Sequence, residues 1–277
     1  MFQIRRHYLD NRTSKKGSPV LFAALVSLFL CALTTSVRAQ GGPPMLTDDP
    51  GTPGDGRWEV NLLSTLERSR NGWVSEAPNV DVNYGLGNHI QLKFEAPWLV
   101  MKEGGARRKA GLGDSMLGVK WRFLDEERNG IDMSIYPQLE FNNPTRSAEH
   151  GLVEKGVRLF LPVEAAKKVG PVEVNGEAGY RVVQHGTDEL EYGLAVARQL
   201  TRRVELIGEL HGSAVRTLRE HELFFNVGSR VRLGKNAALL FSAGRTLRTP
   251  SDEGPHYIAA FGVQFNFANR ILSHRYR

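Results

Sequence analysis

Residues 90–98 read Ile-Gln-Leu-Lys-Phe-Glu-Ala-Pro-Trp, so apolar side chains recur at every second position. Successive side chains of a β-strand point to opposite faces, which gives this stretch one oily face and one largely charged face. The same alternation returns in residues 58–67, 131–141 and 172–182. The pattern predicts an all-β protein in which each strand separates an apolar surface from a polar one.

Twelve segments of this kind follow one another, most of them 10 to 13 residues long. Soluble strands usually have about 5 or 6 residues, whereas a tilted membrane-crossing strand needs about 9 to 11. Hydrocarbon cannot satisfy an open sheet edge, so such strands must close into a ring. We therefore predict a single antiparallel up-and-down transmembrane β-barrel of about 12 strands over residues 57–267. Its strands should start near Arg57, Pro78, His89, Ser115, Ile131, Gly156, Val172, Leu190, Val204, Glu222, Ala237 and Tyr257.

The connections between these segments alternate between long and short. The longer ones are predicted at 69–77, 101–114, 142–155, 214–221 and 246–256, although 185–189 is short where a long one is expected. Outer-membrane barrels have short periplasmic turns and long outer loops, with both chain ends on the short-turn side. This rhythm favours a membrane barrel over the alternative, a secreted soluble β-sandwich. Whether the connection 142–155 folds into the lumen stays open.

The first residues have the character of an export signal. A basic leader precedes an apolar run from Val20 to Leu33, which is shorter than the roughly 20 residues of a membrane-spanning helix. Small residues at Val37 and Ala39 then predict a cleaved signal peptide over residues 1–39, with an uncleaved anchor as the alternative. Residues 40–56, rich in Gly and Pro, should form an irregular lead-in in the periplasm or the lumen, and 268–277 a C-terminal tail.

Composition excludes several classes of function. Residues 1–39 hold six Lys/Arg and one Asp, so most of the formal charge of +6 leaves with the signal peptide and nucleic acid is not an expected partner. The one cysteine, Cys31, lies in the apolar run, and none of the eight histidines has a metal-ligand spacing. Asp48 and Asp49 alone do not specify a calcium site. We expect no metal, no cofactor and no catalysis.

The polar faces of the strands should line a wet, ionic lumen. Seven acidic and seven basic side chains share this face, so neither sign is expected to dominate. A balanced lining can cross-pair and narrow the passage. The predicted lining residues are Lys93, Glu95, Lys120, Arg122, Glu140, Arg158, Glu164, Glu173, Glu177, Arg181, Glu205, Glu209, Arg230 and Arg232.

One pair of residues suggests catalysis instead. His211 and Ser213 share a strand face, so the imidazole could activate the hydroxyl as a nucleophile. Outer-membrane phospholipases are twelve-stranded barrels with a similar His-x-Ser pair and a downstream Asn, and Asn226 follows here. The surrounding sequence does not match theirs, and the pair should face the lumen, away from lipid. A lipid hydrolase is therefore the third reading.

Several stretches resemble a known family. Residues 43–53 (PPMLTDDPGTP), 56–61 (GRWEVN), 111–122 (GLGDSMLGVKWR) and 136–140 (YPQLE) are similar to the barrels of the MetA-pathway of phenol degradation family. The resemblance implies a Gram-negative outer-membrane barrel, often a transporter, with a genetic association to aromatic catabolism. Gly262, Phe265 and Phe267 also resemble the terminal signal that barrels present to the barrel-assembly machinery, with Ala260 in place of the usual polar residue.

These features predict an outer-membrane channel for passive passage of small solutes, aromatic or otherwise hydrophobic. Outer-membrane lipid, the assembly machinery and a small-molecule solute are the expected partners, and the oligomeric state stays open. The first alternative is a structural or binding barrel that conducts nothing. The second is the hydrolase.

Overall fold

The computed structural model describes residues 42–215, 221–249 and 256–268. The predicted signal peptide 1–39 and residues 269–277 of the predicted tail lie outside the described residues. The described chain forms fourteen strand segments and one short helix, α2 (Glu126–Asn129). In chain order the strands are β1 Arg57–Arg68, β2 Gly72–Leu86, β3 Ile90–Glu103, β4 Lys109–Leu112, β5 Ser115–Leu124, β6 Asp132–Ile135, β7 Gln138–Phe141, β8 Val157–Val169, β9 Val172–Val183, β10 Glu189–Gln199, β11 Val204–Val215, β12 His221–Arg232, β13 Ala237–Arg248 and β14 Tyr257–Ala268.

The fourteen segments make twelve barrel strands. Both β4 and β5 pair with β3, and the break between them falls at Gly113 and Asp114. Both β6 and β7 lie between β5 and β8, and they are separated by Tyr136 and Pro137. Proline has no N–H for the ladder, which explains an interruption at Pro137. Each pair of segments therefore acts as one strand with a local irregularity.

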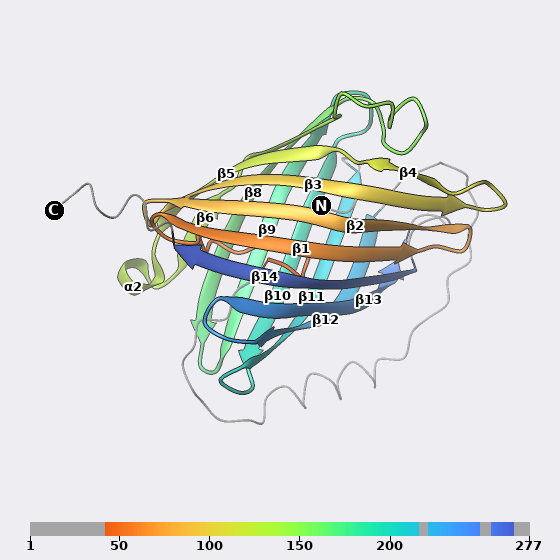
Figure 1. The fold of residues 1–277 in the computed structure, drawn as a ribbon. Coiled ribbons are helices and arrows are strands. Elements are labelled where there is room, and N and C mark those ends of the chain that lie inside the picture. Colours follow the sequence, from red (N-terminus) through yellow and green to blue (C-terminus); the bar gives the residue numbers. More distant parts are fainter. Residues whose placement is uncertain (1–41, 216–220, 250–255, 269–277) are drawn as a thin grey trace.

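All pairings are antiparallel, and β1 pairs with β14 over its whole length, from Arg57 opposite Ala268 to Arg68 opposite Tyr257. This last pairing closes the sheet into a ring, which Figure 1 shows as a wall of strands around a lumen. The prediction of an antiparallel up-and-down barrel of twelve strands is confirmed.

The barrel has its apolar face outside. Leu92, Phe94 and Phe261 are 41%, 44% and 51% exposed. Glu95, which follows Phe94 and faces the other side of the sheet, is only 5% exposed. A soluble β-sandwich would bury those three apolar side chains between its sheets. This exposure fits a surrounding of lipid, because contact with hydrocarbon is favourable for apolar side chains and contact with water is not.

Most strand starts lie within one residue of the prediction, but β2 was placed wrongly. It begins at Gly72 and not at Pro78, because the ladder skips Ala77 and Pro78 as a local irregularity and continues. The predicted connection 69–77 is thus mostly strand, and the connection 101–114 contains the end of β3 and all of β4. Three strands therefore run further toward the loop rim than alternation alone indicated.

The two rims of the barrel differ. Turns 87–89, 170–171, 200–203 and 233–236 are short, and α2 lies at the same rim (Figure 1). The connection 142–156 at the opposite rim is long. The short-turn rim is the periplasmic one in barrels of this kind, and here the first strand begins and the last strand ends at this rim. Within the described ranges, no helix is long and apolar enough to cross a membrane.

Candidate functional site

Residues 42–56, called the lumenal segment below, run through the barrel interior before β1 begins. Met45, Thr47 and Asp49 of this segment are 6%, 0% and 8% exposed, although none of them belongs to a strand. The segment leaves the interior beside the β2–β3 turn, where Gly56 donates its N–H to the carbonyl of Gly85 at 3.0 Å. Of the two locations that the sequence left open, the structure places this segment in the lumen.

Wall side chains satisfy the backbone of the lumenal segment. The amides of Leu46 and Thr47 donate to the carboxylate of Glu209 on β11, the former at 3.2 Å. Arg230 on β12 donates to the carbonyl of Pro43 at 2.9 Å, and Ser242 on β13 donates to the next carbonyl at 2.9 Å. An irregular backbone needs such partners, because it has no ladder of its own. The amide of Asp48 also donates to Glu177 on β9. Side chains of four wall strands, β9, β11, β12 and β13, therefore hold the segment.

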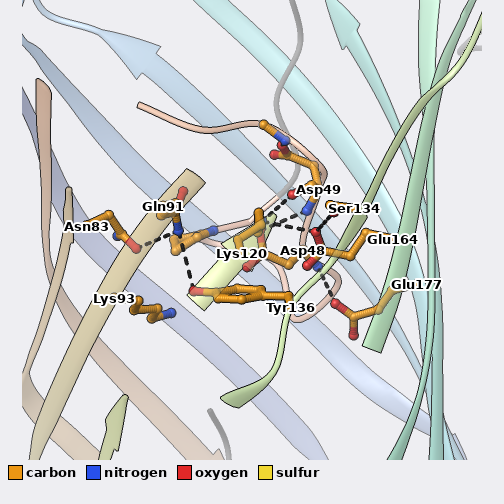
Figure 2. Close-up of polar contacts among 12 residues, drawn as sticks. Asp48, Asp49, Asn83, Gln91, Lys93, Lys120, Ser134, Tyr136, Glu164 and Glu177 are labelled. Atoms are coloured by element: carbon orange, nitrogen blue, oxygen red, sulfur yellow. Dashed lines mark hydrogen bonds and ion pairs between the residues drawn. The ribbon is translucent and has the colours of Figure 1, made fainter. Parts of the chain in front are cut away.

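The centre of this contact is Lys120, which is 1% exposed on β5 (Figure 2). Its Nζ lies 3.1 Å from Asp48 Oδ1 and 3.1 Å from Glu164 Oε2, and 4.5 Å from the ring centroid of Tyr136. It also donates to the carbonyl of Asp49. Burial acts to raise the pKa of Asp48, but the nearby lysine ammonium groups outweigh burial and hold that pKa below its ordinary value. Lys120 thus bridges the segment to the wall.

Small residues on the wall make room for the segment. A Cβ at Gly193 would lie 2.1 Å from Thr47 Oγ1, and a Cβ at Gly228 would lie 2.0 Å from Met45 Cε. Only glycine permits these approaches without displacement. Met45 also packs in a buried apolar cluster with Ala195, Ala197 and Ile207. In this half of the barrel the interior is packed protein, and a void near Asp49 and Arg230 measures only about 30 Å³.

The other half of the lumen contains a cavity of about 500 Å³, called the acidic cavity below. Twelve carboxylate residues line it, against three basic residues and two histidines. The basic residues are engaged: Lys93 lies 3.0 Å from Glu95, and Arg158 lies 2.9 Å from Asp114. Arg181 pairs with Glu191. The lining acids are Asp48, Glu67, Glu76, Asp81, Glu95, Glu103, Asp114, Glu140, Glu154, Glu177, Glu189 and Glu191.

One wall of the acidic cavity is apolar. Leu99 and Met101 on β3 pack with Leu152 and Val153, which belong to the connection 142–156. That connection therefore folds inward over the mouth of the barrel, and Ser147 fastens it by donating to the carbonyl of Leu112 at 2.6 Å. The cavity lies between this loop and the lumenal segment. It offers an oily surface beside a set of carboxylates.

The structure places the fourteen predicted lining residues in three settings. Glu177 and Glu209 contact the lumenal segment, as do Lys120 and Arg230; Glu164 pairs with Lys120 and Glu205 with Arg230 at 3.0 Å. A second group lies around the acidic cavity: Lys93, Glu95, Glu140, Arg158 and Arg181, with Glu177 in both groups. The remaining three, Arg122, Glu173 and Arg232, are half-buried toward the periplasmic rim.

The expected balance of charge does not hold for the cavity. Glu67, Glu76 and Asp81 are 8%, 6% and 2% exposed on the inner face and were absent from the predicted lining. The alternation of Glu67 with the exposed Leu66 was the signal that could have found the first of them. Of the seven predicted basic residues only Lys93, Arg158 and Arg181 border the cavity, so the cavity keeps a surplus of carboxylates.

The proposed catalytic pair does lie on the inner face. His211 and Ser213 both border the acidic cavity, but within the described residues Nδ1 of His211 has no hydrogen-bond partner. Asn226 donates to Glu209 at 3.3 Å. A nucleophile needs its base within hydrogen-bond reach and the base needs an orienting group. Among the described residues, no hydrogen bond orients Nδ1 of His211, and Asn226 bonds to Glu209 instead of to the histidine.

The residues of the predicted insertion signal lie on both faces of β14. Phe265 and Phe267 are 40% and 46% exposed on the outer face. Gly262 faces inward, where a Cβ would lie 2.5 Å from Leu63 Cδ2. Their role with the assembly machinery stays a prediction.

A closed ring of long antiparallel strands, apolar outside and ionic inside, defines the class of outer-membrane β-barrels. Among solved structures, the chain is similar to the COG4313 outer membrane channel from Pseudomonas putida F1, at 16% identity, with a TM-score of 0.60 and coverage of 82% of this chain and 100% of that one. It is also similar to the KdgM porin (11%, 0.53, 76% and 99%) and the NanC porin (9%, 0.50, 74% and 98%). At these identities the likeness shows the fold.

No family model matches the sequence. No curated protein matches it either. The resemblance to the phenol-degradation family therefore stays a prediction, and no residue role is taken from it.

Proposed function

We propose that this protein is an outer-membrane channel that takes small solutes with an apolar or aromatic body and a cationic group. The observation that carries the proposal is the lining of the acidic cavity, where carboxylates outnumber basic residues by twelve to three beside an apolar wall. Rings of carboxylates favour cations in a pore. The apolar wall formed by Leu99, Met101, Leu152 and Val153 supports an uncharged, oily portion on the same solute.

Glu67 gives the site a specific acceptor. It is 8% exposed, it borders the cavity, and among the described residues its carboxylate has neither a hydrogen bond nor an ion pair. Glu76 lies close by, since Thr65 on β1 pairs with Glu76 on β2, and accepts from Asn79 at 3.0 Å. Two neighbouring carboxylates without a basic partner attract a cation more strongly than the ion-paired acids around Arg158 do.

The lumenal segment favours a second candidate, a barrel that binds a ligand and conducts nothing. With this segment seated, the periplasmic half of the interior is filled, as the packing around Met45 and Lys120 shows. Passage through the channel therefore requires the segment to shift. Current and solute flux decide between the two candidates.

The test is the reversal potential of the purified protein in planar bilayers under a KCl gradient. A cation-selective channel shifts this potential toward the value for K⁺, and Glu67→Gln with Glu76→Gln should reduce the shift. The matched control is Glu149→Gln, because Glu149 is 75% exposed at its side chain and does not border the cavity. Uptake of a small aromatic ammonium compound into proteoliposomes should exceed that of an aromatic carboxylate of equal size. An anion preference would overturn the solute class, and absence of both current and flux would favour the binding barrel.

A further inference from the structure

A single row of basic and aromatic side chains crosses the outer face of five neighbouring strands near the loop rim. Arg68 on β1 stands opposite Trp73 on β2 and opposite Tyr257 on β14. Tyr257 stands opposite Arg245 on β13, and Trp73 stands opposite Lys102 on β3. The row therefore reads Arg245, Tyr257, Arg68, Trp73 and Lys102 across β13, β14, β1, β2 and β3, which are adjacent in Figure 1. We call it the basic row.

These side chains are free to meet a partner from outside. Arg68, Lys102 and Arg245 are exposed, and Tyr257 is 58% exposed. Within the described part of the chain, none of the three cations forms an ion pair. The guanidinium of Arg108 adds a further positive charge, since it lies 5.5 Å from the ring centroid of Trp73.

The height of Arg68, the middle residue of the row, matches a membrane boundary. Trp58 marks the periplasmic end of β1, and Arg68 follows ten residues later on the same face. Ten residues at about 3.3 Å each, on a strand tilted by about 40°, rise roughly 25 Å, which is the height of the apolar band of such barrels. The outward residues between them include Leu62 and Leu66, 42% and 45% exposed. Arg68 therefore lies where hydrocarbon gives way to headgroups.

Among the described residues, the outer face of β8 and β9 carries no cation at the loop rim. At the loop rim, the outward positions Val157 on β8 and Val182 on β9 are apolar and 39% and 41% exposed. Tyr180 supplies an aromatic side chain on the outer face of β9, as a general girdle would. The feature that distinguishes β13 to β3 is the cluster of cations, which indicates one local site.

We propose that the basic row binds the phosphate groups of an anionic lipid of the outer leaflet. Guanidinium groups match phosphate oxygens with two parallel N–H donors, and lysine adds a point charge. Tyr257 and Trp73 hold the sugar or glycerol portion at the boundary, where aromatic rings are favoured. This site concerns the outer surface, so it is independent of what passes through the lumen.

Native mass spectrometry of the full protein in detergent tests the site with a bis-phosphorylated lipid A, the same lipid after dephosphorylation, and inorganic phosphate. The wild type should retain the phosphorylated lipid selectively. Arg68→Gln with Arg245→Gln should weaken its binding about tenfold or more, because each basic residue near an anionic surface contributes measurably. The lysine pair, R68K with R245K, should keep most of the binding. The control is Arg146→Gln, which removes an exposed arginine (80% at its side chain) of the connection 142–156.

Three results would overturn the proposal: unchanged binding in the glutamine pair, equal retention of the dephosphorylated lipid, or capture of inorganic phosphate as tightly as lipid A. Heat-modifiable migration on a gel shows that each variant is folded. Should the glutamine pair not fold, wild-type binding in 0.05 M and 0.5 M NaCl gives the answer, because screening must weaken an exposed ionic contact. Binding that ignores salt would contradict the site.

Discussion

Replacing Lys120 with methionine should release the lumenal segment from the wall. Methionine keeps most of the length and volume of lysine, so packing is largely retained while the charge is lost. The change leaves the fully buried carboxylate of Glu164 and the half-buried carboxylate of Asp48 without their cation, each 3.1 Å from the position of the missing ammonium. Removing one partner of a buried pair costs about 3–5 kcal/mol. Glu164 belongs to β8 and cannot leave, whereas Asp48 can return to water with the segment.

That cost sets the size of the effect. Every 1.4 kcal/mol is about a tenfold change in an equilibrium, so a cost of about 3–5 kcal/mol lowers the population of the seated form relative to the released form by roughly 100-fold to 4000-fold. The reporter is Thr47→Cys in a chain with Cys31→Ala, which removes the only native cysteine. Thr47 is 0% exposed, so a membrane-impermeant maleimide should label Cys at this position slowly in the seated form. With Lys120→Met, labelling should be at least tens of times faster.

Two further variants make this prediction refutable. Lys167→Met is the matched control, because Lys167 is exposed on β8, and labelling should not change. Adding Asp48→Asn to Lys120→Met should slow labelling again, since a neutral amide does not need the lost ammonium. Equal labelling rates with and without Lys120, in protein that is folded by heat-modifiable migration, would refute the bridging role of this residue.

Three other outcomes follow from particular contacts. Gly193→Val should also expose the lumenal segment and raise conductance in bilayers, since a Cβ there would lie 2.1 Å from Thr47 Oγ1; unchanged conductance would contradict the close approach. Ser213→Ala should leave phospholipid hydrolysis by the purified protein at the background level of an empty preparation, and any loss of a measurable activity would revive the hydrolase. The hydrogen bond with His89, aided by Arg122, holds the pKa of Asp125 below its ordinary value. The ionised carboxylate therefore stabilises the folded turn above the unfolded pKa, and this stabilisation is lost as the pH falls through the lower folded pKa. Hydrogen exchange at the 125–131 turn should rise below about pH 4 in the wild type but not in Asp125→Asn.

The wall of this barrel could be predicted from sequence because two solvents act on it at once. Outward residues contact lipid and inward residues contact water or protein. The polarity of Leu92 and of Glu95 is therefore enough to predict which face of the sheet each side chain lies on, without information about neighbouring strands. The same rule fails at Pro78, since proline was interpreted as a strand start when the sheet absorbs it as an irregularity. Irregularities of this kind depend on the partner strand, which local sequence does not contain.

The contents of the lumen were less predictable. Residues 42–56 have no periodicity, so nothing in them indicates the path past Lys120 and Arg230. From sequence, Gly193 and Gly228 only appear as residues that weaken a strand. Their role becomes clear from the positions of Thr47 and Met45, which would contact a Cβ at these two glycines. The inward-facing Ala195 and Ile207 also break the expectation of a polar inner face, because part of that face packs against protein.

The surplus of carboxylates in the cavity has a counterpart outside the wall. On β1, Glu67 faces the cavity while its neighbour Arg68 faces outward, and on β3 Glu103 borders the cavity while Lys102 belongs to the basic row. Counting charge along these two strand ends therefore gives balance, because each end contributes one charge of each sign. The sheet separates them onto opposite faces, since successive side chains point in opposite directions. A nearly neutral set of strand ends thus produces an interior that attracts cations and an outer rim that attracts phosphate, and neutralising either face alone should leave the other function intact.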